Sequence, residues 1–184
     1  FLGILRFKAV VDVVIGFDFS RSLLIFFGML SVGIAAFIIL VQKNYKRLLA
    51  YSSIEHMGIV AVGFGFGGLA AQAALLHLLY HALAKSALFL SVGNIFLKYS
   101  STKMANVRGI VSKLPLTGLL FVIGFLVITG IPPFGIFFTE FSILAEGIRY
   151  HPALVVLLLF FLTLTFVGFL RHVAGMMFGE SQKD

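Results

Sequence analysis

Three side chains that can accept and release protons are spaced four residues apart in an apolar stretch of the sequence. They are His77, His81 and Lys85, within the run HLLYHALAKSALFL. In an α-helix each step of four residues advances about 6 Å along the axis and about 40° around it, so these groups form one inclined stripe about 12 Å long. Histidine changes its charge near neutral pH. Such a stripe is typical of a proton relay, whereas a single buried histidine more often only hydrogen bonds to a neighbouring helix.

A second pair of ionisable residues lies upstream, in YSSIEHMG. His56 has few obvious partners there, and we interpret it as a relay group. Glu55 is a secondary candidate, because it lies about two helical turns from Lys46 and Arg47 and can instead form an ion pair with one of them near a membrane interface.

A third ionisable group, Glu140, lies in GIFFTEFSIL. Its neighbours are Phe137, Phe138 and Phe141, so the carboxylate is expected to point into a helix bundle and not towards lipid. Thr139 is a hydroxyl donor next to it and a further secondary candidate. We therefore interpret Glu140 as a proton-carrying group.

Other chemistries fit these residues poorly. His77 and His81 lie on one helix and cannot bind opposite faces of one haem. A zinc site of the HExxH type would need a glutamate that this HxxxH pair lacks, and a third ligand. The chain contains no cysteine, which excludes disulfides, thiolate zinc sites and cysteine-bound iron–sulfur clusters on it. We expect no metal, no cofactor and no covalent catalysis.

The composition places these residues in a membrane. The chain is 60% hydrophobic and 11% charged, against about 45–50% and about 25% in soluble domains. A soluble fold of this size could not bury so much apolar surface, so part of it must face lipid. The net charge of +7 comes from cations in short loops between apolar runs. Nucleic-acid binding is therefore not expected.

The apolar runs predict an all-α, polytopic membrane helix bundle that forms a single transmembrane domain across residues 1–184. Residues 1–16 resemble the end of a preceding helix, and we expect both ends of the chain to be cut from a longer protein. The predicted spans are 22–42, 48–67, 70–97, 114–147 and 152–173.

The fourth span cannot be one regular helix. At about 1.5 Å per residue it would reach about 51 Å, against a hydrocarbon core of about 30 Å. Pro132 and Pro133 lie in its middle and remove two backbone donors. We predict a broken helix whose second half begins near Phe134. Broken helices at membrane depth commonly mark ion pathways, although a plain proline kink remains an alternative.

The charges of the loops predict the orientation of the spans. Loops 43–47 and 98–113 carry most of the cations, whereas Glu146 and Arg149 offset one another between the fourth and fifth spans. By the positive-inside rule, loops 43–47 and 98–113 are cytoplasmic. The first span then runs inward from the outer side.

Taken together, these motifs resemble the antiporter-like membrane subunits of respiratory complex I, the multisubunit sodium/proton antiporters and the group 4 membrane-bound hydrogenases. The segments that carry the resemblance are NYKRLLAYSSIEHMGIV, HLLYHALAKSALFLSVGNIF, RGIVSKLPLTG and TGIPPFGIFFTEFSIL. They occur in the order that the family shows and extend over essentially the whole chain. The IEHMG form is most similar to the hydrogenase-4 component F type.

The resemblance implies more than the pattern alone does. In this family two inverted five-helix repeats each contain a broken helix and a half-channel, and the chain resembles the second repeat. The family's relay histidine corresponds to His56, and the relay groups of its next helix to His77, His81 and Lys85. Its proton-exit residue on the broken helix corresponds to Glu140. The family's central lysine lies on the preceding helix, upstream of the part that corresponds to LGILRF.

The function expected from residues and resemblance is proton translocation by a membrane subunit of an ion-pumping redox complex, of the hydrogenase-4/formate hydrogenlyase or NADH-quinone oxidoreductase type. The expected location is a bacterial or archaeal cytoplasmic membrane. The expected partners are lipid, other membrane subunits and a peripheral redox module. Two alternatives remain open. The chain can belong to a sodium/proton antiporter that carries Na⁺, or it can be a non-conducting membrane anchor.

Overall fold

The computed structural model describes residues 1–179, and in these residues the regular structure is helical throughout. The all-α prediction is therefore confirmed. In chain order the elements are α1 (Leu2–Val14), α2 (Phe17–Val41), α3 (Tyr45–Phe66), α4 (Gly68–Tyr99), the 3-10 helix η1 (Met104–Asn106), α5 (Ile110–Lys113), α6 (Pro115–Ile128), α7 (Gly135–Tyr150) and α8 (Pro152–Phe178).

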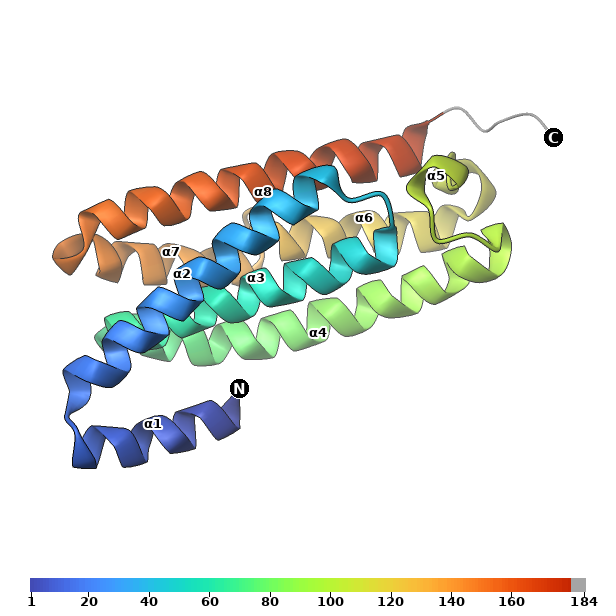
Figure 1. The fold of residues 1–184 in the computed structure, drawn as a ribbon. Helices are drawn as coiled ribbons and strands as arrows, with labels where there is room; N and C mark the ends of the chain where they lie inside the picture. Colours follow the sequence, from blue (N-terminus) through green and yellow to red (C-terminus); the bar gives the residue numbers. More distant parts are fainter. Residues whose placement is uncertain (180–184) are drawn as a thin grey trace.

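Four of these helices are long and apolar enough to cross a membrane, namely α2, α3, α4 and α8. The fifth crossing is shared, because α6 and α7 follow one another along the bundle with an irregular link between them (Figure 1). The broken helix that the two prolines predicted is thus confirmed. The short helix α1 lies at the edge of the bundle, beside the N-terminal part of α2 (Figure 1).

The surface of the bundle is as apolar as its interior. Large side chains such as Phe26, Leu90 and Phe141 are more than 40% exposed on the outer faces of their helices. In water such a surface would be unstable, whereas in a bilayer it replaces the contacts that lipid tails make with one another. Among residues 1–179, ten polar or charged side chains are instead buried inside the bundle.

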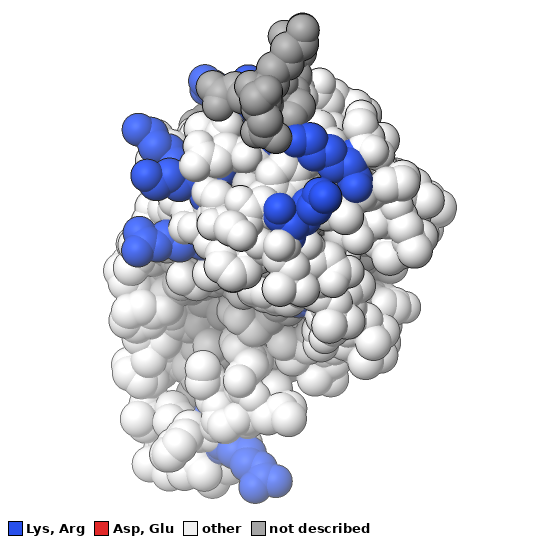
Figure 2. All heavy atoms as spheres, turned by 90° about the vertical axis from the view of Figure 1, so that its right-hand side faces the viewer, with Lys and Arg blue, Asp and Glu red and all other residues white. Residues whose placement is uncertain are grey.

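One end of the bundle carries the cations. Figure 2 views this end and shows Lys and Arg side chains gathered there. The two cationic loops, 43–47 and 98–113, are joined. The amide of Asn44 donates to Thr102 Oγ1 (2.9 Å), and the Tyr45 hydroxyl donates to the Ser101 carbonyl (2.9 Å). Asn44 also caps α3 by accepting hydrogen bonds from the backbone of Lys46 and Arg47. The loop 98–113 contains η1 and α5, which the sequence pattern did not predict.

Close packing of α2 against α3 depends on two glycines that face each other. A Cβ added to Gly28 would lie 2.7 Å from the carbonyl oxygen of Gly58, and a Cβ added to Gly58 would lie 2.7 Å from the carbonyl oxygen of Gly28. Small residues let the backbones of membrane helices approach closely, which increases the van der Waals packing that helps to hold helices together in lipid.

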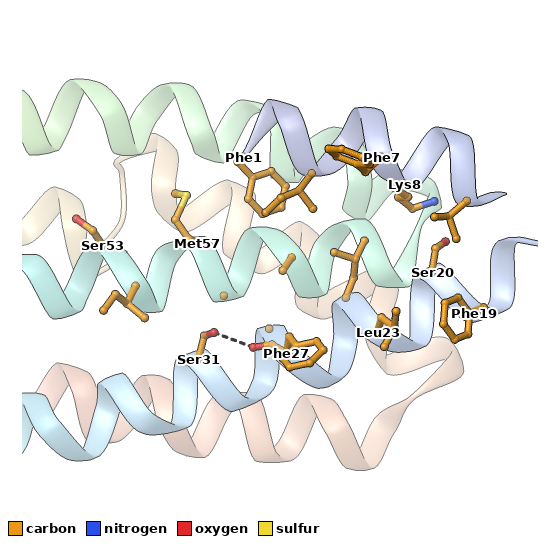
Figure 3. Close-up of a pocket in the computed structure, with 17 residues that line it drawn as sticks. Phe1, Phe7, Lys8, Phe19, Ser20, Leu23, Phe27, Ser31, Ser53 and Met57 are labelled. Carbon is orange, nitrogen blue, oxygen red and sulfur yellow. Dashed lines mark hydrogen bonds between the residues drawn. The ribbon is translucent and has the colours of Figure 1, made fainter. Parts of the chain in front are cut away.

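An apolar cavity of about 650 Å³ separates α1 from the α2–α3 pair. Figure 3 shows the side chains of Phe1, Phe27 and Met57 directed into it from these three helices. Among the described residues that line it, Lys8 alone has a charged side chain, and its ammonium group forms an ion pair with Asp12. The cavity is therefore separate from the buried ionisable residues described below.

We expect Gly28→Ala to lower the stability of the protein by about 1–3 kcal/mol, because the added methyl group must push α2 away from α3. Thermal unfolding in detergent measures this effect. Gly93→Ala on α4 is the matched control, since a Cβ at Gly93 meets nothing within 4 Å. Equal unfolding temperatures for the two variants would show that the close approach of α2 and α3 is not required.

Candidate functional site

The break between α6 and α7 places Glu140 inside the bundle. Helix α6 ends at Ile128, and the Thr129 hydroxyl donates back to the Phe125 carbonyl (2.9 Å). Gly130 then adopts a positive φ of 63°, a conformation that glycine reaches without steric cost. A Cβ at Gly130 would also collide with Oε2 of Glu140. The chain therefore needs glycine at this point for two reasons, and the carboxylate of Glu140 packs directly against the break.

Three residues from three helices form a buried chain of hydrogen bonds. Nδ1 of His56 on α3 lies 2.9 Å from Nε2 of His77 on α4, and Nδ1 of His77 lies 2.9 Å from the Thr139 hydroxyl on α7. Each of the three side chains is less than 5% exposed. The chain thus joins residues far apart in the sequence across the centre of the bundle.

The direction of these hydrogen bonds follows from Thr139. Its hydroxyl has one hydrogen, which it donates to the Ile136 carbonyl (2.8 Å), so its oxygen accepts from Nδ1 of His77. In neutral His77 the other ring nitrogen is then an acceptor, and it accepts from Nδ1–H of His56. Both histidines are therefore fixed as Nδ1–H tautomers when they are neutral.

Glu140 lies next to this chain. Its Oε1 is 3.9 Å from Nδ1 of His56, the same nitrogen that contacts His77. The proton on His56 Nδ1 therefore has two neighbouring acceptors, the His77 ring and the Glu140 carboxylate. The arrangement allows a proton to pass from His56 towards either side.

Lys85 and His81 complete the stripe on α4. The ammonium group of Lys85 donates to the Leu49 carbonyl and to the Ser52 hydroxyl, both on α3. The ring of His81 lies 4.9 Å from the ring of His56, between centroids, and its Nε2 has no hydrogen-bond partner within residues 1–179. Lys85, His81 and His77 are all buried, so the stripe faces α3 and α7 and not lipid.

Glu55 lies inside the bundle and not in the interface ion pair with Lys46 or Arg47 that its sequence position allowed. It is 3% exposed and lines a small cavity with Thr165 of α8 and Glu140 of α7. Lys46 instead lies over the ring of Phe96, 3.9 Å from its centroid. No ion pair joins Glu55 to Lys46 or Arg47 in the part of the chain that the structure describes.

Sequence reasoning did not find Ser52, Gly130 or Thr165 as parts of this site. A signal for Thr165 exists, because a buried hydroxyl in the otherwise apolar α8 needs a polar partner. Ser52 gives no such signal, since serine is common near helix ends. Gly130 belongs to the break, but its contact with Glu140 depends on the fold.

The donor atoms of His56, His77 and Glu140 lie within 4.8 Å of one another, a grouping that resembles a metal site. The sequence analysis considered only the His77–His81 spacing. However, the two ring nitrogens are 2.9 Å apart, and each already takes part in a hydrogen bond. A tetrahedral zinc ion with bonds of about 2.0–2.1 Å to nitrogen would hold them about 3.3 Å apart. The geometry is that of a hydrogen-bonded pair.

Known proteins show the same helices. A family model described as "NADH:quinone oxidoreductase/Mrp antiporter, TM" matches residues 1–166. A Hydrogenase-4 component F homolog from Methylacidiphilum infernorum (isolate V4) is 38% identical over 183 residues, which are 99% of this chain and 38% of that protein. This relative agrees with the resemblance carried by the IEHMG motif.

Two solved structures share the fold. In respiratory complex I from Thermus thermophilus with bound NADH, one chain matches all of this chain and 40% of its own length, with 26% identity and a TM-score of 0.88. In the archaeal membrane-bound sulfane sulfur reductase, one chain matches 99% of this chain and 39% of its own, with 29% identity and a TM-score of 0.86.

This chain therefore spans well under half of the length of these relatives. The match to residues 1–166, the relative at 38% identity and the shared fold confirm the resemblance seen in the motifs. The chain belongs to the membrane-embedded family of NADH:quinone oxidoreductase and Mrp antiporter subunits.

Proposed function

We propose that this chain carries protons through one half-channel of a membrane subunit in an ion-pumping redox complex. One observation carries the proposal. Proton-exchanging groups from α3, α4 and α7 meet in a buried chain, His56–His77–Thr139, and the carboxylate of Glu140 lies against it beside the helix break. Buried ionisable groups are costly in a membrane and are retained where they serve transport.

The proposed route begins at Lys85, which lies nearer the cationic end of α4 than the histidines do. A proton released by Lys85 passes to His81 and then to the ring of His56, whose centroid lies 4.9 Å from that of His81. His56 then releases the proton on Nδ1 to Glu140, 3.9 Å away. Glu140 delivers it towards the outer side, where α7 ends at Tyr150.

The hydrogen bonds of His77 place it beside the proposed proton route and not on it. A proton that moves from His56 to Nε2 of His77 can go no further, because Thr139 already donates its only hydrogen to the Ile136 carbonyl. His77 and Thr139 thus hold His56 in the tautomer that points a proton at Glu140. His77 can also hold the proton from His56 while Glu140 is already protonated.

The complex around the chain is proposed from its relatives. Their printed names are those of a hydrogenase component homolog and of chains in respiratory complexes. Other membrane subunits and a peripheral redox module would supply the driving energy, as shifts in buried charge that alter the proton affinity of Lys85. Lipid surrounds the apolar faces, in a bacterial or archaeal cytoplasmic membrane, with loops 43–47 and 98–113 on the cytoplasmic side.

The alternative of a sodium/proton antiporter uses the same buried residues and differs in the ion and in the neighbouring subunits. The geometry favours protons at the centre of this site, since imidazole nitrogens exchange protons and are poor ligands for hard cations. A membrane anchor without conduction would leave three buried histidines, a buried lysine and two carboxylates inside the bundle without a purpose.

Replacing Glu140 with glutamine should abolish proton translocation, because an amide cannot take up the proton that His56 releases. The measurement is redox-driven acidification of proteoliposomes that contain the assembled complex, repeated with and without sodium. Glu146→Gln is the matched control on the same helix, where the native carboxylate pairs with Arg149. Retained pumping by the Glu140→Gln complex would contradict the role of Glu140, and a rate that requires sodium would favour the antiporter alternative.

Replacing Thr139 with valine should slow translocation by about tenfold or more without abolishing it, because His77 and then His56 lose their fixed tautomers. Thr139→Ser should restore the native rate, since serine supplies the same oxygen. The ring-nitrogen NMR signals of selectively labelled histidine report the tautomers directly. An unchanged tautomer in the valine variant would show that Thr139 does not orient His77.

The orientation can be tested with single cysteines, since this chain has none of its own. In a background without other cysteines, Lys103→Cys should react with a membrane-impermeant maleimide only from the cytoplasmic side. Arg149→Cys, at the opposite end of the bundle, should react only from the outer side. The reverse pattern would overturn the assignment of the cationic loops to the cytoplasm.

A further inference from the structure

A small internal cavity of about 30 Å³ lies where α3, α6, α7 and α8 meet. Its polar lining consists of Glu55, His56, Thr129, Glu140 and Thr165, and the rest of the lining is apolar. A cavity holds a water molecule when it offers at least about 10–15 Å³ and two to four polar partners. This cavity meets both conditions.

Two of its polar groups, the carboxyl of Glu55 and the hydroxyl of Thr165, are deeply buried. Glu55 is 3% exposed and Thr165 is 5% exposed. Thr165 Oγ1 has no hydrogen-bond partner among the described residues. A hydroxyl or carboxyl buried without a hydrogen bond costs about 1–3 kcal/mol. A water molecule in the cavity that both side chains line can supply the missing hydrogen bond of Thr165.

We propose that this cavity holds one ordered water molecule that bridges Glu55 and Glu140 and makes Glu55 a second proton acceptor, with Thr165 as its positioning residue. The proposal rests on the proposed function and adds to it a carboxylate on α3 and a hydroxyl on α8. Glu140 then faces two carriers, His56 on one side and Glu55 across the water on the other.

The transfer balances without any further reactant. Glu140 in its acid form gives its proton to the bridging water, while that water gives one of its own protons to the carboxylate of Glu55. The result is ionised Glu140, protonated Glu55 and an unchanged water molecule. The Thr165 hydroxyl can donate to one carboxylate and accept from the water, which fixes the water between the two acids.

A metal cation fits the cavity less well than water does. Hard cations prefer sites made of oxygen ligands, and here a histidine and four apolar side chains take much of the lining. These four are Ile128, Leu162, Phe166 and Phe169. Sodium binding is therefore the outcome that the experiment must separate from a bridging water.

The test uses the assembled complex in proteoliposomes with two readouts, proton translocation and infrared difference spectra of protonated carboxyl groups in H₂¹⁶O and H₂¹⁸O. Thr165→Val should lower the translocation rate by about tenfold and shift the carboxyl band of Glu140. Thr165→Ser should restore both. Thr163→Val is the matched control, two residues away on the lipid-exposed face of α8. If the valine variant does not assemble, Thr165→Ala carries the same prediction, since it also removes the hydroxyl.

Glu55→Gln should remove one carboxyl band and lower translocation to a similar extent. Native rates and bands in the Glu55 and Thr165 variants, together with an inactive Glu140→Gln complex, would overturn the water bridge and leave the proposed function standing. Full activity of Glu140→Gln would instead overturn the proposed function. Loss of ²²Na⁺ uptake in Glu55→Gln with unchanged proton translocation would identify a sodium site and reject the bridge.

Discussion

The need to give buried ionisable side chains hydrogen-bond partners controls much of the interior of this bundle. Charge is expensive in a membrane interior, and water is scarce there, so side chains must satisfy one another. The hydrogen bonds from His56 to His77 and from His77 to Thr139 meet this need across three helices. Lys85 meets it through the backbone and a serine of α3. The helices cannot rotate against one another without breaking these contacts, so the bonds of the proposed proton route also fix the packing.

This constraint explains why part of the structure was predictable. Apolar runs and the Pro132–Pro133 pair depend only on local chemistry, so the helices and the break between α6 and α7 could be predicted from the sequence. The inward direction of Glu140 was also predictable, because Phe138 and Phe141 beside it take the lipid-facing positions. Each of these features follows from the cost of placing one kind of residue in lipid.

The remainder depends on which helices become neighbours. Nothing in the order of residues shows that His56 contacts His77, or that the hydroxyl of Thr139 sets the tautomers of both. The local pattern left open an interface ion pair for Glu55, since Lys46 and Arg47 are near in sequence. The fold instead directs Glu55 towards α8, and the ammonium group of Lys46 packs over the ring of Phe96 on α4. Tertiary packing decides between partners that the sequence leaves equivalent.

The link between the two cationic loops has a consequence for biosynthesis. Asn44 precedes the start of α3, and its partner Thr102 follows the end of α4, 58 positions further along the chain. A ribosome that adds about 5–20 residues per second needs roughly 3–12 s to make that stretch. During this time the loop between α2 and α3 lacks this hydrogen bond. The Asn44–Thr102 contact can therefore stabilise α2 and α3 only after the second cationic loop has been made.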